Sequence, residues 1–303
     1  MQRLSSPGPS VDSSTGADDS DSDGSDSIEA LVGVLSGRRI VALTGAGCST
    51  ESGIPDYRGK GRPPARSPIQ HDAFVRRADV RQRYWARATA GWERFSQSQP
   101  NAAHHALAAL EAAGTLNGII TQNVDRLHHA AGSRRVIELH GALAEVTCLS
   151  CGTRETRDAL HARLLEANPE WLTNWRARAA ASAPDGDTEL PTTEVEGFRV
   201  LDCLVCDGAL MPDVVFFGGT VPQEKVADAW SLIDSAEALL IVGSSLAVYS
   251  GWRFVRGAAE RGLPIAIINL GPTRADDLCQ VRIDAKAGDI LPRLVSRLRL
   301  PLP

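Results

Sequence analysis

The sequence predicts an α/β fold: a Rossmann-like parallel sheet with helices on both faces, joined to a smaller inserted domain. Three observations lead to this prediction. Short runs of Val, Ile and Leu alternate with helical patterns, as in βαβ units. Two long stretches interrupt that alternation, and the second of them contains two Cys-x-x-Cys pairs. The 303 residues suffice for one large domain carrying a smaller insertion.

The expected strands are nearly continuous apolar runs, which are typical of strands covered on both faces. They are residues 39–43, 118–121, 136–139, 214–217, 239–242, 264–269 and 281–283. The expected helices are residues 28–35, 102–113, 225–234, 252–261 and 290–298. The second of these helices follows Pro100-Asn101 and stops at Gly114, which are ordinary start and stop signals.

The chain divides into a tail and a folded region. Residues 1–27 are expected to be a disordered acidic tail, because Ser, Gly, Pro and Asp dominate it and cannot bury enough apolar surface to offset chain ordering. Residues 28–303 form the folded region. Its Rossmann-like domain comprises residues 28–58, 100–141 and 209–303, and its small domain comprises the insertions 59–99 (helical) and 142–208 (with the cysteine pairs).

Composition excludes some classes of function. The net charge of -5 argues against general nucleic-acid binding. No apolar run approaches the roughly 18 residues of a membrane helix, so no membrane association is expected. The N-terminal residues lack the apolar core of a secretory signal, and their aspartates oppose a transit peptide. We therefore expect a cytoplasmic location, with cysteines that are reduced or bound to metal.

A glycine-rich turn follows the first expected strand. The sequence Arg39-Ile-Val-Ala-Leu-Thr-Gly-Ala-Gly47 runs from a strand into a turn whose backbone N–H groups can approach a pyrophosphate. The third glycine of the G-x-G-x-x-G fingerprint is absent, because Thr50 stands in its place. The turn alone therefore fits a simple tight turn equally well.

The residues after this turn closely resemble the cofactor loop of the sirtuin family: Gly45-Ala-Gly-Cys-Ser-Thr-Glu-Ser-Gly-Ile-Pro-Asp-Tyr-Arg58. The resemblance spans residues 28–298, and Tyr57 with segment 81–87 is most similar to the class II branch. It implies an NAD-dependent protein-lysine deacylase that acts on acyl-lysine proteins and yields nicotinamide, O-acyl-ADP-ribose and free lysine. Further motifs follow in family order: Thr121-Gln-Asn-Val-Asp125, Glu138-Leu-His-Gly141, Met211-Pro-Asp-Val-Val-Phe-Phe-Gly218, Val242-Gly-Ser-Ser-Leu246 and Asn269-Leu-Gly-Pro-Thr273.

By this resemblance, several loops bind NAD. Asn123 positions the nicotinamide ribose and a water, Asp125 binds the nicotinamide carboxamide, and Asn269 lies on the adenine-side ribose. On chemistry alone, Asn123 and Asp125 fit helix caps equally well. The implied cofactor residues are Gly45, Ala46, Gly47, Ser49, Ile54, Pro55, Asp56, Tyr57, Arg58, Gln122, Asn123, Val124, Asp125, Gly243, Ser244, Ser245, Asn269, Leu270, Gly271 and Ala287.

His140 is the expected general base, with Asn123 beside it in the catalytic set. It follows the expected strand 136–139, at the carboxyl end where α/β enzymes place their sites, and imidazole titrates nearest to neutrality. A lone histidine is more often packed or solvent-facing, and the resemblance reverses that judgement. His104 and His128 lie in helical runs without a comparable motif, so a structural role is expected for both.

Two cysteine pairs predict a metal site. Cys148-x-x-Cys151 and Cys203-x-x-Cys206 place two thiolates on each of two turns, enough for one tetrahedral Zn²⁺. Four thiolates leave no open position, so the zinc would be structural. Redox-active or simply packed cysteines are the alternative, given the long gap between the pairs.

The resemblance also predicts where substrate binds. Val214, Phe216, Phe217, Gly218 and Val248 are expected to flank the acyl-lysine peptide, which would lie as an extra strand between two loops.

Tyr84 and Arg87 have the Tyr-x-x-Arg spacing that reads a terminal carboxylate in acid-acyl sirtuins, since a guanidinium binds carboxylate bidentately. The alternative is that Arg87 is an ordinary solvated or salt-bridged helix residue. For the whole chain, the competing functions are NAD-dependent protein ADP-ribosyl transfer and a non-catalytic NAD sensor or scaffold.

Overall fold

A six-stranded parallel sheet forms the larger part of the molecule in the computed structural model, which describes residues 20–56, 68–176 and 195–298. The strand order is β3-β2-β1-β7-β8-β9, and every neighbouring pair runs parallel. The predicted α/β class is thus confirmed. The strands are β1 (Ile40–Thr44), β2 (Leu116–Thr121), β3 (Val136–Glu138), β7 (Ala238–Val242), β8 (Ile265–Ile268) and β9 (Val281–Ile283).

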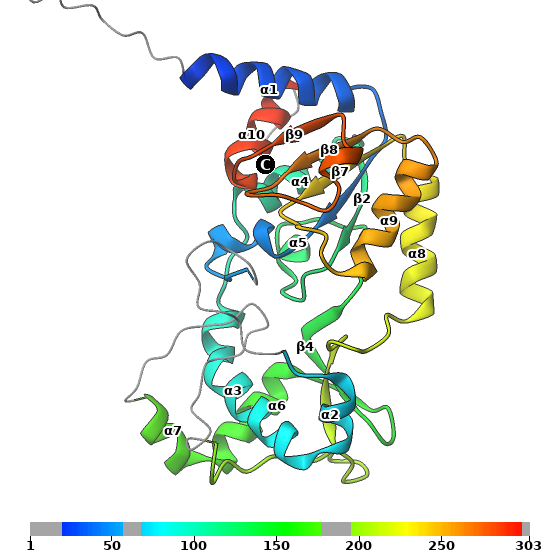
Figure 1. Ribbon diagram of the computed structural model, residues 1–303. Coiled ribbons are helices and arrows are strands. Elements are labelled where there is room, and N and C mark those ends of the chain that lie inside the picture. The colour runs from blue at the N-terminus through cyan, green and yellow to red at the C-terminus, as the bar shows by residue number, and fades with distance from the viewer. Residues whose placement is uncertain (1–19, 57–67, 177–194, 299–303) are drawn as a thin grey trace, which may run out of the picture.

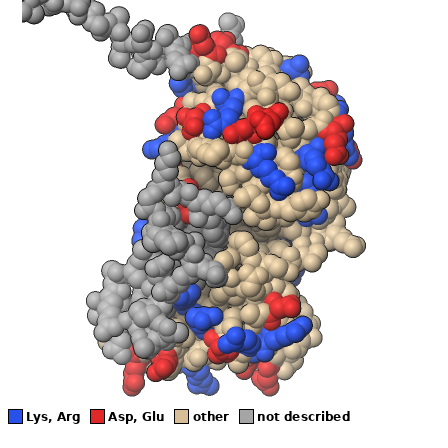
Figure 2. Space-filling view, viewed as in Figure 1, with Lys and Arg blue, Asp and Glu red and all other residues tan. Residues whose placement is uncertain are grey.

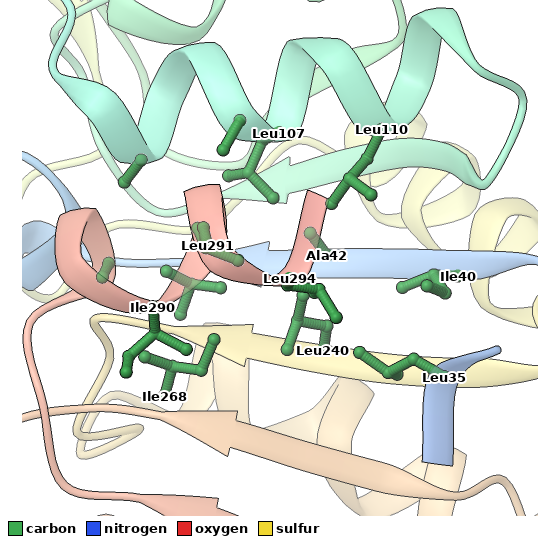
Figure 3. Packing of buried hydrophobic residues seen from close by; sticks show 14 of the residues in the cluster. Leu35, Ile40, Ala42, Leu107, Leu110, Leu240, Ile268, Ile290, Leu291 and Leu294 are labelled. Atoms are coloured by element: carbon green, nitrogen blue, oxygen red, sulfur yellow. The ribbon is translucent and has the colours of Figure 1, made fainter. Parts of the chain in front are cut away.

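Helices cover both faces of this sheet (Figure 1). The first face packs against α1 (Ser20–Leu35), α4 (Ala102–Ala112) and α10 (Ala287–Arg297), and the second against α8 (Gln223–Asp234) and α9 (Tyr249–Glu260). Successive strand residues point to opposite faces, so Ile40 and Ala42 belong to one core while Val41 and Leu43 belong to the other. Figure 3 shows leucines of α4 and α10 meeting over Ala42 and Leu240.

The first helix corrects one prediction. The acidic tail was expected to be disordered through residue 27, but α1 begins at Ser20. Ile28, Leu31 and Leu35 lie on one helical face and are buried against the sheet, which anchors the second half of the helix. Residues 1–19 lie outside the described residues.

The two insertions form one smaller unit below the main sheet (Figure 1). A shared core joins Phe74 and Trp85 of the first insertion to Val146, Leu160 and Phe198 of the second. Its antiparallel sheet has the order β5-β4-β6. The elements of this unit are α2 (His71–Arg76), α3 (Ala78–Ser96), β4 (Gly141–Cys148), β5 (Arg154–Thr156), α6 (Arg157–Ala167), α7 (Pro169–Arg176) and β6 (Leu210–Val214).

The expected strand at residues 214–217 is wrong in position and in partner. The strand is β6, Leu210–Val214, and it lies antiparallel to β4 at the edge of the small sheet rather than in the parallel sheet. Pro212 lacks an N–H and so argues against a strand in the sequence, but an edge strand tolerates it. Between Val214 and α8, Phe217 forms an isolated bridge with Gln70 and no further strand follows in the described residues. The small unit therefore extends past residue 208.

Short elements complete the fold. They are η1 (Ala46–Cys48), η2 (Thr50–Ser52), α5 (Leu127–Ala130) and η4 (Asp276–Leu278). Among the described residues, no helix has both the length and the apolar character required to cross a bilayer. On the face drawn in Figure 2, acidic and basic side chains of the described residues are interspersed.

Candidate active site

The predicted motif loops converge at one edge of the parallel sheet. Because all strands of this sheet run the same way, the loops that follow their carboxyl ends emerge together. The converging segments are residues 45–49 after β1, 122–125 after β2, His140 after β3, 243–246 after β7 and 269–271 after β8.

The glycine loop packs directly against the loop after β7. The Gly45 N–H donates to the Val242 carbonyl at 3.1 Å, and the Gly47 N–H donates to the Gly243 carbonyl at 2.8 Å. A Cβ on Gly47 would lie 2.9 Å from Gly243 Cα, so this approach requires a glycine. A pocket opens beside the two loops, lined by Gly47, Thr50, Asp56, Gly243, Ile268, Asn269, Leu270, Ala285, Lys286 and Ala287. Gly47, Gly243 and Ala287 in this lining are small, so a dinucleotide could approach the backbone closely.

A hydrogen-bond network ties the β1 loop to the β2 loop. Asn123 Nδ2 donates to the Gly45 carbonyl at 3.1 Å and to Ser49 Oγ at 3.0 Å. Ser49 Oγ donates to Asp125 Oδ2 at 2.7 Å, and Asp125 Oδ1 accepts from the Leu127 N–H at 2.9 Å. Burial raises the pKa of Asp125, and these two hydrogen bonds oppose that rise. Asp125 therefore both accepts the first N–H of α5 and contacts the cofactor loop.

Gln122 links three of the loops. Its side-chain Nε2 donates to Ser244 Oγ at 2.8 Å, which connects the β2 loop to the β7 loop. Its backbone carbonyl lies 2.8 Å from His140 Nδ1. A carbonyl can only accept, so Nδ1 carries the imidazole proton.

The tautomer of His140 leaves a basic nitrogen available. With the proton on Nδ1, the unprotonated Nε2 accepts from Ser250 Oγ at 2.7 Å. Burial lowers the pKa of His140, and Lys225 and Arg253 lower it further, against the bond to Gln122, which raises it. The imidazole is accordingly neutral near pH 7, the form that a general base requires.

The two cysteine pairs meet at the end of β4. Cys148 Sγ lies 3.5 Å from Cys206 Sγ, and Cys151 Sγ lies 3.7 Å from Cys203 Sγ. Backbone N–H groups point at the sulfurs, including Ser150 to Cys148 at 3.4 Å, and such bonds favour the thiolate of Cys148. All four sulfurs fall within 4.8 Å of one another. This donor set fits one tetrahedral structural Zn²⁺ with no open position.

Comparison with known proteins agrees with this geometry. The model of the Sir2 family matches residues 45–250. The chain is 50% identical over 271 residues to an NAD-dependent protein deacetylase of Bordetella bronchiseptica, covering 89% of this chain and 97% of the relative. It is 51% identical over 259 residues to the NAD-dependent protein lipoamidase sirtuin-4, mitochondrial, of Homo sapiens, covering 84% and 81%. The chain belongs to the Sir2 family.

Solved Sir2 structures share the fold. A Sir2 protein bound to acetylated peptide superposes with a TM-score of 0.71 at 29% identity, covering 89% of this chain and 98% of that one. A Sir2 complex with a p53 peptide and NAD⁺ gives a TM-score of 0.70 at 29% identity, with the same coverages. Both the sheet and the small unit of this Sir2-family chain are therefore covered by the match.

Not every predicted residue reaches the site. Tyr57 and Arg58 lie outside the described residues. Tyr84 is only 2% exposed, and its ring packs edge-on against Phe74 and Phe216, at 5.3 Å in each case. Tyr84 and Phe216 thus contribute to the core of the small unit, and Arg87, one turn further on, is half-buried.

The expected peptide-binding segment runs beside the base. The Val215 N–H donates to the His140 carbonyl at 2.9 Å, which places residues 215–218 next to His140. Phe217 is 40% exposed, and Val248 is the N-cap residue just before α9, the helix that contains Ser250. Ser250 is the residue that the sequence did not single out. Its contact with His140 depends on how α9 docks, and no local motif signals that.

Proposed function

We propose that His140, Asn123 and the converging loops form the active site of an NAD-dependent protein-lysine deacylase. This Sir2-family chain is an NAD-dependent protein deacylase by its family and its relatives. The observation that supports the residue assignment is the tautomer of His140, whose basic Nε2 faces the carboxyl edge of the sheet. That edge also holds the glycine loop and the pocket beside it.

Each loop has a separate task. The 45–47 and 243–245 loops supply closely packed backbone for the phosphates, and Asn269 lies in the pocket where the adenine-side ribose is expected. Asn123 and Asp125 hold the nicotinamide end through a preformed network, so little reorganisation is needed when the ligand arrives. Bound NAD⁺ supplies a ribose that releases nicotinamide and accepts the acyl group.

His140 moves the proton. Its Nε2 takes the proton from the hydroxyl of the NAD⁺ ribose that accepts the acyl group. The Gln122 carbonyl then stabilises the resulting imidazolium through Nδ1–H. The Ser250 hydroxyl occupies Nε2 in this structure, so it must rotate away as that hydroxyl arrives. Ser250 also keeps the lone pair of Nε2 oriented until then.

The substrate is an acylated lysine in a protein or peptide. Residues 215–218 follow the bond from Val215 to His140, residues 247–249 lead into α9, and an extended peptide between these two segments would bond mainly through its backbone. Sequence preference around the lysine is then loose. The cytoplasmic location and the lack of direct nucleic-acid binding stay predictions.

A panel of acyl-lysine peptides incubated with NAD⁺ and followed by mass spectrometry tests the function. We expect free lysine peptide, nicotinamide and O-acyl-ADP-ribose in equal amounts, and none of these with His140→Ala. Labelled ADP-ribose that attaches to protein without acyl peptide would instead support ADP-ribosyl transfer. NAD⁺ binding without turnover on any peptide would support a sensor or scaffold.

A further inference from the structure

Three buried side chains that the proposed mechanism does not use lie behind the cofactor loop. Cys48 ends η1, His104 lies in α4 and His128 lies in α5, and their exposed fractions are 0%, 0% and 1%. The two imidazole rings stand 4.9 Å apart between centroids. One ligand atom from each side chain falls within 4.8 Å of the others. A thiol and two imidazoles thus surround one point in the interior.

The hydrogen bonds of His128 leave one ring nitrogen unused. Thr44 Oγ1 donates its proton to Thr121 Oγ1 at 2.8 Å, so its lone pairs are available to accept. His128 Nε2 lies 2.9 Å from Thr44 Oγ1 and therefore carries the proton. His128 Nδ1 is then a bare lone pair, and it is buried with no hydrogen-bond partner. Buried polar atoms are normally satisfied, so this atom calls for an explanation.

His104 can present its other nitrogen to the same point. Its Nδ1 lies 3.0 Å from Asn101 Oδ1, and in the tautomer that donates to this oxygen Nδ1 carries the proton. Its Nε2 is then unprotonated, with only Ser49 Oγ at 3.5 Å beside it. The Asn101 N–H also lies 3.3 Å from Nδ1, and metal binding would select the tautomer that donates to Oδ1. Metal-binding histidines commonly donate their second N–H to an oxygen in this way.

We propose that Cys48 Sγ, His104 Nε2 and His128 Nδ1 form a second zinc site, separate from the four-cysteine site. One thiolate with two neutral imidazoles is a donor set that suits Zn²⁺. Zinc takes sulfur at about 2.3 Å and nitrogen at about 2.0–2.1 Å, so the ligand atoms need to close in by roughly an ångström. The Cys48 and His104 side chains would have to turn toward His128 to close this gap.

Binding releases one proton. The Cys48 S–H bond breaks as the Zn–S bond forms, and the proton passes to solvent, while both imidazoles bind in their neutral form. The bound group carries a net charge of +1, and Asp125, which hydrogen-bonds Ser49 next to Cys48, is a nearby acid that would offset it. Cys48 directly follows Gly47, so the ion would hold the end of the cofactor loop to α4 and α5.

Zinc content of the full-length protein tests the proposal without any assay of catalysis. After saturation with Zn²⁺ and removal of the excess, elemental analysis should give two zinc ions per chain. Cys48→Ser and His104→Gln should each retain one, and Cys279→Ser, a matched change at a cysteine outside both sites, should retain two. Two different ligand variants keep the test valid if one of them fails to fold.

Cobalt gives a second measurement. Co²⁺ titration should show two binding events in the wild type, and Cys48→Ser should lose one of them together with its sulfur-to-cobalt absorption. Saturation of the wild type at one ion per chain would overturn the proposal. Two ions that persist in both Cys48→Ser and His104→Gln would place the second ion elsewhere and overturn it equally.

Discussion

At the scale of single residues, the proposed chemistry depends on which nitrogen of His140 carries a proton. The Gln122 carbonyl fixes it on Nδ1, and no side chain is needed for that. The sequence singles out His140 because it follows a strand and lies in a motif, and its role as the base stays a prediction. It could not predict Ser250, which is 110 positions away and meets Nε2 only through tertiary packing.

Replacing His140 by Ala should lower deacylation by at least about 10²–10⁴-fold, the usual effect of removing a general base. NAD⁺ affinity should change little, because the 45–47 and 243–245 loops hold the cofactor. Single-turnover rates and calorimetric NAD⁺ titration measure the two effects separately. A variant with near wild-type turnover would remove His140 from the mechanism.

Replacing Ser250 by Ala should move the acid limb of kcat/KM to higher pH. The Ser250 hydroxyl donates to neutral Nε2 and so stabilises the unprotonated imidazole, and we expect its removal to raise the pKa of His140. More of the base is then protonated, and inactive, at a given acidic pH. The shift should be small, since such a bond contributes only about 1 kcal/mol, and Ser250→Thr should largely restore the wild-type profile. Identical profiles for wild type and Ser250→Ala would show that the contact does not tune the base.

At the scale of elements, the parallel strands were predictable and the small antiparallel sheet was not. β1, β7 and β8 are fully buried on both faces, so each is an apolar run that stands out locally. β4 mixes buried and half-buried residues, and β6 includes Pro212, so their pairing depends on contacts more than 60 positions apart, such as Thr147 with Met211. Distant contacts also explain the start of α1, which the structure places at Ser20 and the sequence predicted at residue 28: the second half of this helix is anchored by the sheet.

Loss of a ligand from the four-cysteine site should destabilise the small unit before it affects the chemistry. Cys148→Ser and Cys203→Ser should lower the yield of folded protein and the melting temperature, because zinc binding at such sites is coupled to folding. Each kcal/mol lost should lower the melting temperature by roughly 2–4 °C. Cys279→Ser, outside the cluster, is the control and should behave as wild type. Equal melting temperatures for all three variants would contradict a structural zinc.

At the scale of the whole molecule, the site is shared between two units with different tasks. The parallel sheet carries the cofactor loops and His140, while the small unit brings β6 and α3 to the same edge. An apolar cluster joins the two units: Ile54 from the cofactor loop packs with Trp92 and Phe95 of α3 and with Leu143 of β4. If the predicted residues act as proposed, cofactor binding and acyl selection belong to different parts of the chain, and substitutions should separate them.

Acyl selection is the property to test at this scale. If Arg87 reads a terminal carboxylate, the wild type should prefer succinyl- or glutaryl-lysine to acetyl-lysine, and Arg87→Ala should reduce that preference about 10- to 100-fold, the effect of losing a hydrogen bond to a charged group. The KM for NAD⁺ should stay unchanged, because Arg87 belongs to the small unit.

Tyr84 needs a more conservative substitution. Its ring is packed against Phe74 and Phe216, so Tyr84→Phe removes the hydroxyl and keeps the core. The values of kcat/KM for wild type and both variants on matched acetyl, succinyl and glutaryl peptides measure this preference among acyl groups. The same ranking of acyl groups in all three proteins would show that this pair is structural.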